Sequence, residues 1–335
     1  MKCMQWMTLA HEGWVMVLFG LLILVMLALD LGLVNRKSHV VSNKEAILWS
    51  LIWIGLSMGF SGFLWWISPP ALATEVLVEF QTAYWIEKAL SVDNLFVFIL
   101  VFQYFNVPTE YHHKVLFWGI LGAIVMRALF IFTGTELIGM TYFPEFTVGE
   151  HSFRVNGLLT VFGLFLVFAG VKSAFVPSED DGEKDFSKSP GAKVIYLFFR
   201  VSKEYHGDRF FTRENGLRLA TPLLVVVGVV EFTDLLFAVD SIPAIFAVSD
   251  QPLILYTSNI FAILGLRSLY FLLANFVDRF RYLKYGLAFI LSFIGVKMVL
   301  APVVHVPSAL SLGLVLSVLL FSSLVSILIP EKRNP

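Results

Sequence analysis

The chain carries at residues 219–248 the sequence LATPLLVVVGVVEFTDLLFAVDSIPAIFAV. A run of this length is more than enough to cross a membrane, since a helix of about 20 apolar residues spans a hydrocarbon layer of about 30 Å. Its middle nevertheless contains three carboxylates, Glu231, Asp234 and Asp240. Ionised groups inside a membrane are costly and rare, so this segment indicates a membrane helix that carries functional residues.

Apolar runs of similar length recur along the chain. Of the 335 residues, 58% are hydrophobic and 15% are charged, whereas soluble globular chains are about 45–50% apolar and about 25% charged. The runs are too long and too continuous for the alternating strands of a β-barrel. We therefore predict an all-α polytopic membrane protein in which 1–335 form a single membrane domain. About nine transmembrane helices are expected, at 13–34, 46–67, 80–104, 114–135, 155–176, 219–248, 253–275, 283–304 and 308–329.

Lysine and arginine are distributed unevenly between the connecting segments. With the N-terminus outside, the inner segments hold 17 of the 24 Lys and Arg residues, and the outer segments hold only Lys2 and Arg154. Because cytoplasmic loops are enriched in these residues, we expect the N-terminus on the outer, periplasmic side and the C-terminus in the cytoplasm. Residues 177–218, the one long polar stretch, are expected to form a partly disordered cytoplasmic linker.

Composition also excludes several classes of protein. A net charge of −1 gives no reason to expect a nucleic acid as partner. The single cysteine, Cys3, provides neither a disulfide framework nor a soft-metal site. No His pair, zinc motif or nucleophile motif accompanies the acids, so we expect neither an enzyme nor a bound cofactor. The expected partners are a divalent metal ion and the lipid bilayer, and the oligomeric state stays open.

An internal repeat relates two halves of the chain. Residues 87–94, EKALSVDN, align with residues 234–241, DLLFAVDS, so an acid, an Asp and a small polar residue recur at the same spacing. Arg127 and Arg267 follow in matching order, as do two Gly-Val-Lys segments that end at Lys172 and Lys297. Each copy holds three helices, an odd number, so the copies enter the membrane from opposite sides, as in many secondary transporters. The expected division is two leading helices at 13–79, a first repeat at 80–176, the linker, a second repeat at 219–304, and a last helix and tail at 305–335.

The repeated acids predict one ion site between the two copies. Residues seven apart share a helix face, so Glu87 with Asn94 forms one polar stripe and Asp234 with Ser241 forms its counterpart. Asp93 and Asp240 point roughly 120° away in a regular helix. Their convergence on one ion needs a local break, for which Pro243 is the candidate.

Carboxylate, amide, hydroxyl and carbonyl oxygens suit hard divalent ions such as Mn²⁺, Ca²⁺ and Mg²⁺. Carboxylates also carry protons, so metal binding and protonation compete at the same groups.

Structural ion pairing with Arg127, Arg267 or Lys88 is the alternative role for these acids. We expect the two arginines to act as counter-ions that hold the site together without an ion, since they repel a cation. Further candidate ligands are Glu231, Asn259 and Asp30, although helix–helix contacts or interfacial water explain them equally well. The glycines expected to allow close helix packing are Gly119, Gly122, Gly163 and Gly170.

Residues 87–98, EKALSVDNLFVF, and residues 231–248, EFTDLLFAVDSIPAIFAV, resemble the two signature segments of the TerC family, named for tellurium resistance. Further similarity at 257–271 and 283–288 extends the resemblance over about helices one to nine. It implies an inner-membrane protein that exports Mn²⁺ and protects against its excess. It also places the family's acidic motif at Glu87, Asp93, Asn94, Asp234, Asp240 and Ser241.

Two other functions stay open at this stage. Ligand chemistry alone does not distinguish Mn²⁺ export from a Ca²⁺/H⁺ or Na⁺/H⁺ exchanger. A membrane scaffold of a metal-resistance complex, docking through the charged linker, is an alternative of a different class. Tellurite itself is an anion, which an acid-lined site repels, so the family's name gives little chemical guidance.

Overall fold

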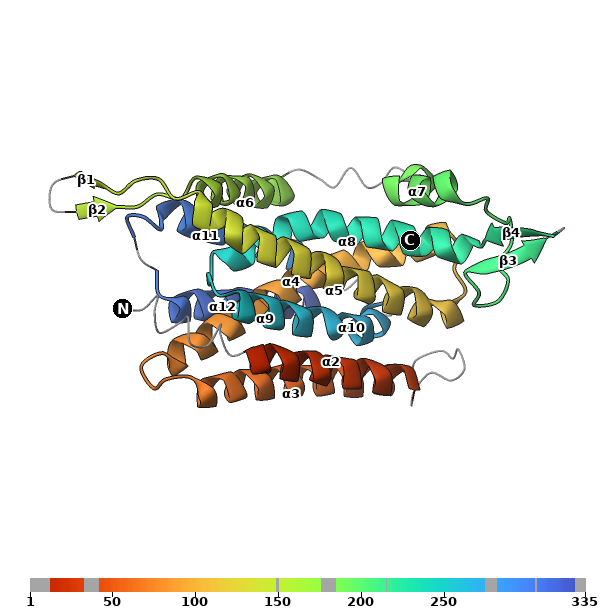
Figure 1. Cartoon of the computed structure of the whole chain (residues 1–335), viewed down its shortest axis with the longest axis horizontal. Helices are drawn as coiled ribbons and strands as arrows, with labels where there is room; N and C mark the ends of the chain where they lie inside the picture. Colours follow the sequence, from red (N-terminus) through yellow and green to blue (C-terminus); the bar gives the residue numbers. More distant parts are fainter. Residues whose placement is uncertain are drawn as a thin grey trace.

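The computed structural model describes residues 13–32, 42–148, 151–175, 185–214, 216–274, 282–304 and 306–328. Long helices form a bundle along the longest axis of the molecule, and two short antiparallel hairpins lie at its opposite ends (Figure 1). The helices are α2 (Gly13–Gly32), α3 (Asn43–Ile67), α4 (Ala73–Tyr104), α5 (Thr109–Met140), α6 (Gly157–Phe175), α7 (Pro190–Phe198), α8 (Pro222–Phe246), α9 (Pro252–Leu264), α10 (Leu266–Leu273), α11 (Leu283–Leu300) and α12 (Ser308–Leu328), with the short 3₁₀ helix η1 (Phe186–Lys188). In the hairpins, β1 (Phe146–Val148) pairs with β2 (His151–Phe153), and β3 (Phe211–Glu214) pairs with β4 (Leu217–Ala220).

The all-α polytopic membrane class is confirmed. Seven segments of the described chain are long and apolar enough to cross a membrane: Asn43–Ile67, Thr109–Met140, Gly157–Phe175, Pro222–Phe246, Pro252–Leu273, Leu283–Leu300 and Ser308–Ser326. Helix α4 is 32 residues long but carries Glu87, Lys88 and Asp93 in its middle, and the apolar part of α2 is shorter. The number of nine transmembrane helices therefore stays a prediction.

Helix α9 lies at the centre of the bundle. Every residue from Leu253 to Leu264 is buried except Tyr256. Beside it, the rings of Phe60, Phe80 and Phe261 pack with centroids 5.3–6.4 Å apart. The outer helices α2, α6 and α12 instead expose large apolar side chains along their lengths, as lipid-facing helices do.

The predicted break at Pro243 is wrong. Helix α8 runs unbroken through Pro243 to Phe246, because neighbouring helices in a membrane bundle make a helical proline tolerable. The break lies instead in the helix predicted at 253–275, which is divided at Gly265 into α9 and α10. A Cβ atom at Gly265 would lie 2.4 Å from Nζ of Lys88, so the missing side chain leaves room for this lysine.

The third helices of the two predicted repeats make a reciprocal contact. A Cβ at Gly170 of α6 would lie 2.6 Å from the carbonyl oxygen of Ala288 and 2.3 Å from Oγ of Ser292 in α11. A Cβ at Gly295 of α11 would lie 2.6 Å from the carbonyl oxygen of Gly163 and 2.7 Å from the amide nitrogen of Val167 in α6.

Each residue in one half of this contact stands 125 positions after its equivalent in the other half. Helix α4 likewise packs on α9 while α8 packs on α5. These pairings exchange the first and second helices of the predicted copies, as a two-fold relation between the copies requires.

Part of the predicted linker is folded. Residues 185–220 contain η1, α7 and the β3–β4 hairpin, and a Cβ at Gly191 of α7 would lie 2.1 Å from the carbonyl oxygen of Gly228 in α8. The Tyr205 hydroxyl donates to the carbonyl of Phe105 at 2.8 Å, and Lys114 pairs with Asp208 at 3.0 Å. These contacts attach the segment to one end of the bundle, while the predicted division of the chain into segments stays a prediction.

Candidate functional site

A buried ionic network joins three helices at the middle of the bundle. Glu87 of α4, Arg127 of α5 and Asn259 of α9 are all fully buried. Arg127 Nη1 donates to Glu87 Oε1 and, at 3.0 Å, to Asn259 Oδ1. The Asn259 amide in turn donates to Glu87 Oε2 at 3.0 Å. The three side chains therefore form a closed triangle of hydrogen bonds.

The second repeat contributes its own acid to the same arginine. Arg127 Nη2 lies 3.6 Å from Asp234 Oδ1, and Arg127 Nη1 donates to Ser241 Oγ at 3.4 Å. The Ser91 hydroxyl donates to Glu87 Oε1 at 3.2 Å. One guanidinium thus joins a carboxylate from each predicted copy. We call Glu87, Ser91, Arg127, Asp234, Ser241 and Asn259 the central network.

The charges in the central network do not balance. Two carboxylates share one guanidinium, which leaves one excess negative charge if both acids are ionised. Arg127 Nε and Nη2 are also buried without a hydrogen-bond partner in the described part of the chain. An ion buried in protein costs several kcal/mol unless it is well paired, and the buried Arg267, which lines the space beside Asp234, is a second cation at this place.

No open metal site is formed by the described side chains. Among the residues that the structure describes, no three His, Cys, Asp or Glu side chains come close enough together to hold a metal ion. The space beside Asp234 and Arg267 is only about 10 Å³, which is about the volume that one water needs. In this structure, the guanidinium of Arg127 lies between the carboxylates of Glu87 and Asp234.

The structure brings five of the predicted site residues together, namely Glu87, Arg127, Asp234, Ser241 and Asn259. Asn94 is buried in α4 but is not part of the central network as described. Arg267 is buried and lines the small space beside Asp234. The side chains of Asp93, Asp240 and Asp30 lie outside the described residues.

Glu231 lies against Gly122 of α5, outside the central network as defined above. A Cβ at Gly122 of α5 would lie 2.0 Å from Glu231 Oε2, so the glycine makes room for the carboxylate. Gly119, Gly163 and Gly170 also sit at close helix contacts, which confirms the packing role expected for these four glycines.

Lys88 lies at the break between α9 and α10. Its side chain is 6% exposed, and its ammonium donates to the carbonyl of Ala262 at 3.2 Å. The last carbonyls of a helix lack partners within the helix and form its negative end. The hydrogen bond from Lys88 therefore satisfies one of these carbonyls at the interruption.

Cavities open at the two ends of α4. One, of about 680 Å³, lies between the end of α4, the start of α5 and the end of α10, and includes His112 and Tyr270. The other, of about 450 Å³, lies where α4 and α12 begin and α8 and α11 end, and includes Glu75 and Glu79. These two acids were not among the predicted site residues, although their spacing of four on one helix face was a usable signal. The central network lies between the two cavities along α4.

Long apolar helices packed around a buried ionic network define a polytopic helical membrane protein. The chain belongs to the TerC family, because the model of the "Integral membrane protein TerC family" matches residues 72–334. This confirms the resemblance found in the sequence.

Relatives cover nearly the whole chain. A Salmonella typhi protein named "Putative membrane-bound redox modulator Alx" is 43% identical over 321 residues, which cover 94% of each chain. "Uncharacterized membrane protein STKORF319" of Myxococcus xanthus is 43% identical over 313 residues, covering 93% of this chain and 91% of its own. A Rickettsia bellii membrane protein is 38% identical over 312 residues, covering 93% of this chain and 96% of its own. No solved structure matches the chain.

Proposed function

We propose that this protein is a transporter that exports divalent cations, Mn²⁺ above all, from the cytoplasm across the inner membrane. The observation that carries the proposal is the sharing of Arg127 by Glu87 and Asp234, one acid from each predicted repeat. Two carboxylates that meet at the repeat interface resemble the arrangement from which secondary transporters build their sites.

The ligand chemistry favours a hard cation. The central network offers carboxylate, amide and hydroxyl oxygens, and its described members include no sulfur ligand. Asp93 and Asp240 stand in the same two helices and would add oxygen ligands. Such ligands suit Mn²⁺ and Ca²⁺ better than soft ions.

Arg127 supplies positive charge to the central network when no metal ion is bound. Its guanidinium offsets the acids when the cation has left, so the interior never holds two uncompensated carboxylates. An arriving divalent ion competes with the guanidinium for the same oxygens, and protons compete for them as well. Exchange of Mn²⁺ against protons is thus compatible with the residues present.

The name of the Alx relatives also mentions a second function, redox modulation. This chain has a single cysteine, so it has no pair of thiols that could form a disulfide within one molecule. We therefore propose that any influence on redox state is indirect and follows from the ion that is moved.

The test is metal tolerance of cells that depend on this protein. Asp93→Ala and Asp240→Ala are expected to abolish Mn²⁺ resistance while the protein still inserts into the membrane. Glu145→Gln is the matched control, because Glu145 is an exposed acid outside the helices. Mn²⁺ export retained in both aspartate variants would contradict the proposal.

The same metal-tolerance assay distinguishes a transporter from the scaffold alternative. Deletion of Asp180 to Lys188 removes part of the charged linker and leaves the membrane acids in place. A scaffold that docks through this linker loses its function in the deletion and keeps it in the aspartate variants. A transporter shows the opposite pattern.

A further inference from the structure

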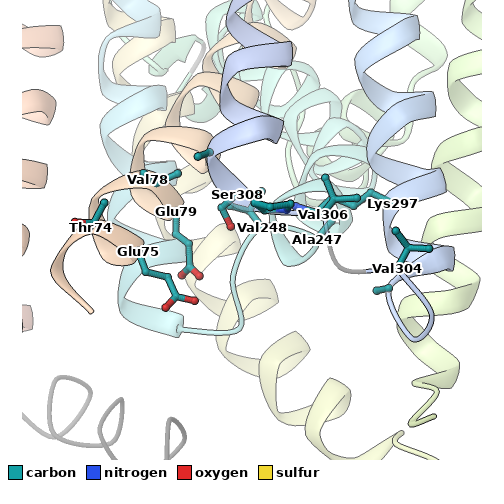
Figure 2. A pocket seen from close by; sticks show the side chains of 13 residues that line it. Thr74, Glu75, Val78, Glu79, Ala247, Val248, Lys297, Val304, Val306 and Ser308 are labelled. Atoms are coloured by element: carbon teal, nitrogen blue, oxygen red, sulfur yellow. The ribbon is translucent and has the colours of Figure 1, made fainter. Parts of the chain in front are cut away.

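The cavity of about 450 Å³ where α4 begins is acidic. Figure 2 shows the carboxylates of Glu75 and Glu79 on successive turns of α4, with Lys297 of α11 on another wall. Ala247 and Val248, which follow α8, and Ser308, which begins α12, complete the lining used here. This acidic cavity is separate from the central network, since Glu79 precedes Glu87 by eight residues, roughly 12 Å along the helix.

Glu79 is the unusual member of the lining. Its side chain lines the cavity, yet the residue is only 8% exposed and its Oε2 atom has no hydrogen-bond partner in the described chain. A buried oxygen without a partner is costly, so a ligand that contacts Oε2 would be favoured.

The surrounding charges select a cation. Glu75 and Asp250 add negative charge near Glu79, and Lys297 adds one positive charge. The Lys297 ammonium donates to Ser311 Oγ at 3.0 Å and makes no ion pair with Glu79 within 4.0 Å. The charged side chains that line the cavity are the carboxylates of Glu75 and Glu79 and the ammonium of Lys297.

We propose that this acidic cavity is a second cation site, in which Glu75 and Glu79 bind a hard divalent ion with water as the further ligands. Two carboxylates four residues apart on a helix lie side by side, and Mn²⁺ accepts carboxylate and water oxygens together. With only two protein carboxylates, the ion keeps part of its water shell and is released readily. Binding of the ion at this cavity does not depend on the proposed transport function.

The test is Mn²⁺ binding to the full-length protein in lipid nanodiscs, followed by electron paramagnetic resonance of free Mn²⁺. Wild type is expected to bind an ion at the acidic cavity, and Glu79→Gln is expected to weaken that binding at least tenfold. Glu145→Gln, which removes an exposed acid elsewhere, is expected to leave the binding unchanged. Equal affinity in wild type and Glu79→Gln would overturn the inference.

Two further variants make the result independent of folding and of the central network. Lys297→Gln removes the opposing charge and keeps Glu79, so it is expected to tighten binding severalfold; unchanged or weaker binding would count against the site. Glu87→Gln is expected to retain the ion at the acidic cavity. If wild type binds Mn²⁺ through Glu79 but moves none across a membrane, the second site stands and the transport proposal fails.

Discussion

Arg127 is a fully buried guanidinium that holds acids from two helices. Removing one partner from a buried ionic network leaves an uncompensated charge, which typically costs about 3–5 kcal/mol. Replacing both partners of a buried pair costs much less. The size of the loss therefore depends on which charges are left behind.

We expect Arg127→Gln to lower the free energy of unfolding by about 3–5 kcal/mol, measured by thermal or detergent-induced unfolding of the purified protein. The double variant Arg127→Gln with Glu87→Gln is expected to recover part of that loss. Arg154→Gln, which replaces an exposed arginine between β2 and α6, is the control and is expected to be nearly neutral. A double variant that is less stable than Arg127→Gln alone would show that Glu87 is not coupled to the arginine.

The acids of the site were predictable at the residue scale, and their partners were only partly so. Glu87 and Asp234 stand out because a charge in an apolar run of the sequence is conspicuous. That one arginine serves both acids was not predictable, because the choice depends on how α4, α5 and α8 pack. The spacing of Glu75 and Glu79 was visible, but only the cavity distinguishes them from acids at a wet helix end.

At the scale of the helices, the contact between α6 and α11 tests the inverted repeat. Gly170 and Gly295 both lack room for a Cβ atom, each against backbone atoms of the partner helix. We expect Gly170→Ala and Gly295→Ala each to destabilise the protein by about 1–3 kcal/mol, since an added methyl group forces the helices apart. Equal losses in the two variants would agree with the two-fold relation.

Gly59→Ala is the matched control for these variants, because Gly59 lies in α3 with no atom within 4 Å of the added Cβ. It is expected to be neutral or slightly stabilising, as alanine favours a helix by up to about 1 kcal/mol over glycine. Unfolding curves of all three variants provide the comparison. Stability unchanged at both Gly170 and Gly295 would contradict the close approach of α6 and α11.

The contacts of Glu214 predict how the stability of the β3–β4 hairpin depends on pH. The Ser202 hydroxyl donates to Glu214 at 2.6 Å and His206 lies 2.9 Å from the same carboxylate, and both interactions lower the pKa of Glu214 below its ordinary value of 4.5. A lowered pKa stabilises the folded form above the unfolded pKa, and that stabilisation is lost as the pH falls through the folded pKa. Hydrogen exchange in 201–220 is therefore expected to increase below about pH 4.5 relative to the rest of the chain. Glu214→Gln is expected to remove this difference, and a profile identical to wild type would contradict the assignment.

Sequence patterns predict the ends of helices better than they predict interruptions within helices. The apolar runs predicted most helices to within a few residues, and Pro222 and Pro252 mark two helix starts, as prolines at first helical positions do. The break was assigned to Pro243, the residue that most disfavours a helix in isolation. Helix α8 is instead continuous, and the interruption at Gly265 lies in another helix, where Lys88 occupies the space beside the glycine. Such a contact has no local signature.

At the scale of the whole molecule, we predict how the protein is oriented in the membrane. The folded segment 185–220 lies at the end of the bundle opposite the β1–β2 hairpin (Figure 1), and lysines and arginines are concentrated there. In a Cys3→Ser background, we expect an impermeant thiol reagent added outside intact cells to label Glu145→Cys and not Lys203→Cys. The reverse pattern would contradict a cytoplasmic position for 185–220.

The most direct test of the transport proposal is ion flux through the purified protein in proteoliposomes. Wild type is expected to carry Mn²⁺, with Ca²⁺ and Na⁺ as competitors that reveal the selectivity. Glu87→Gln and Asp234→Asn are expected to abolish the flux, and Glu145→Gln is expected to retain it. Mn²⁺ flux at the wild-type rate in both Glu87→Gln and Asp234→Asn would show that the shared acids do not carry the ion.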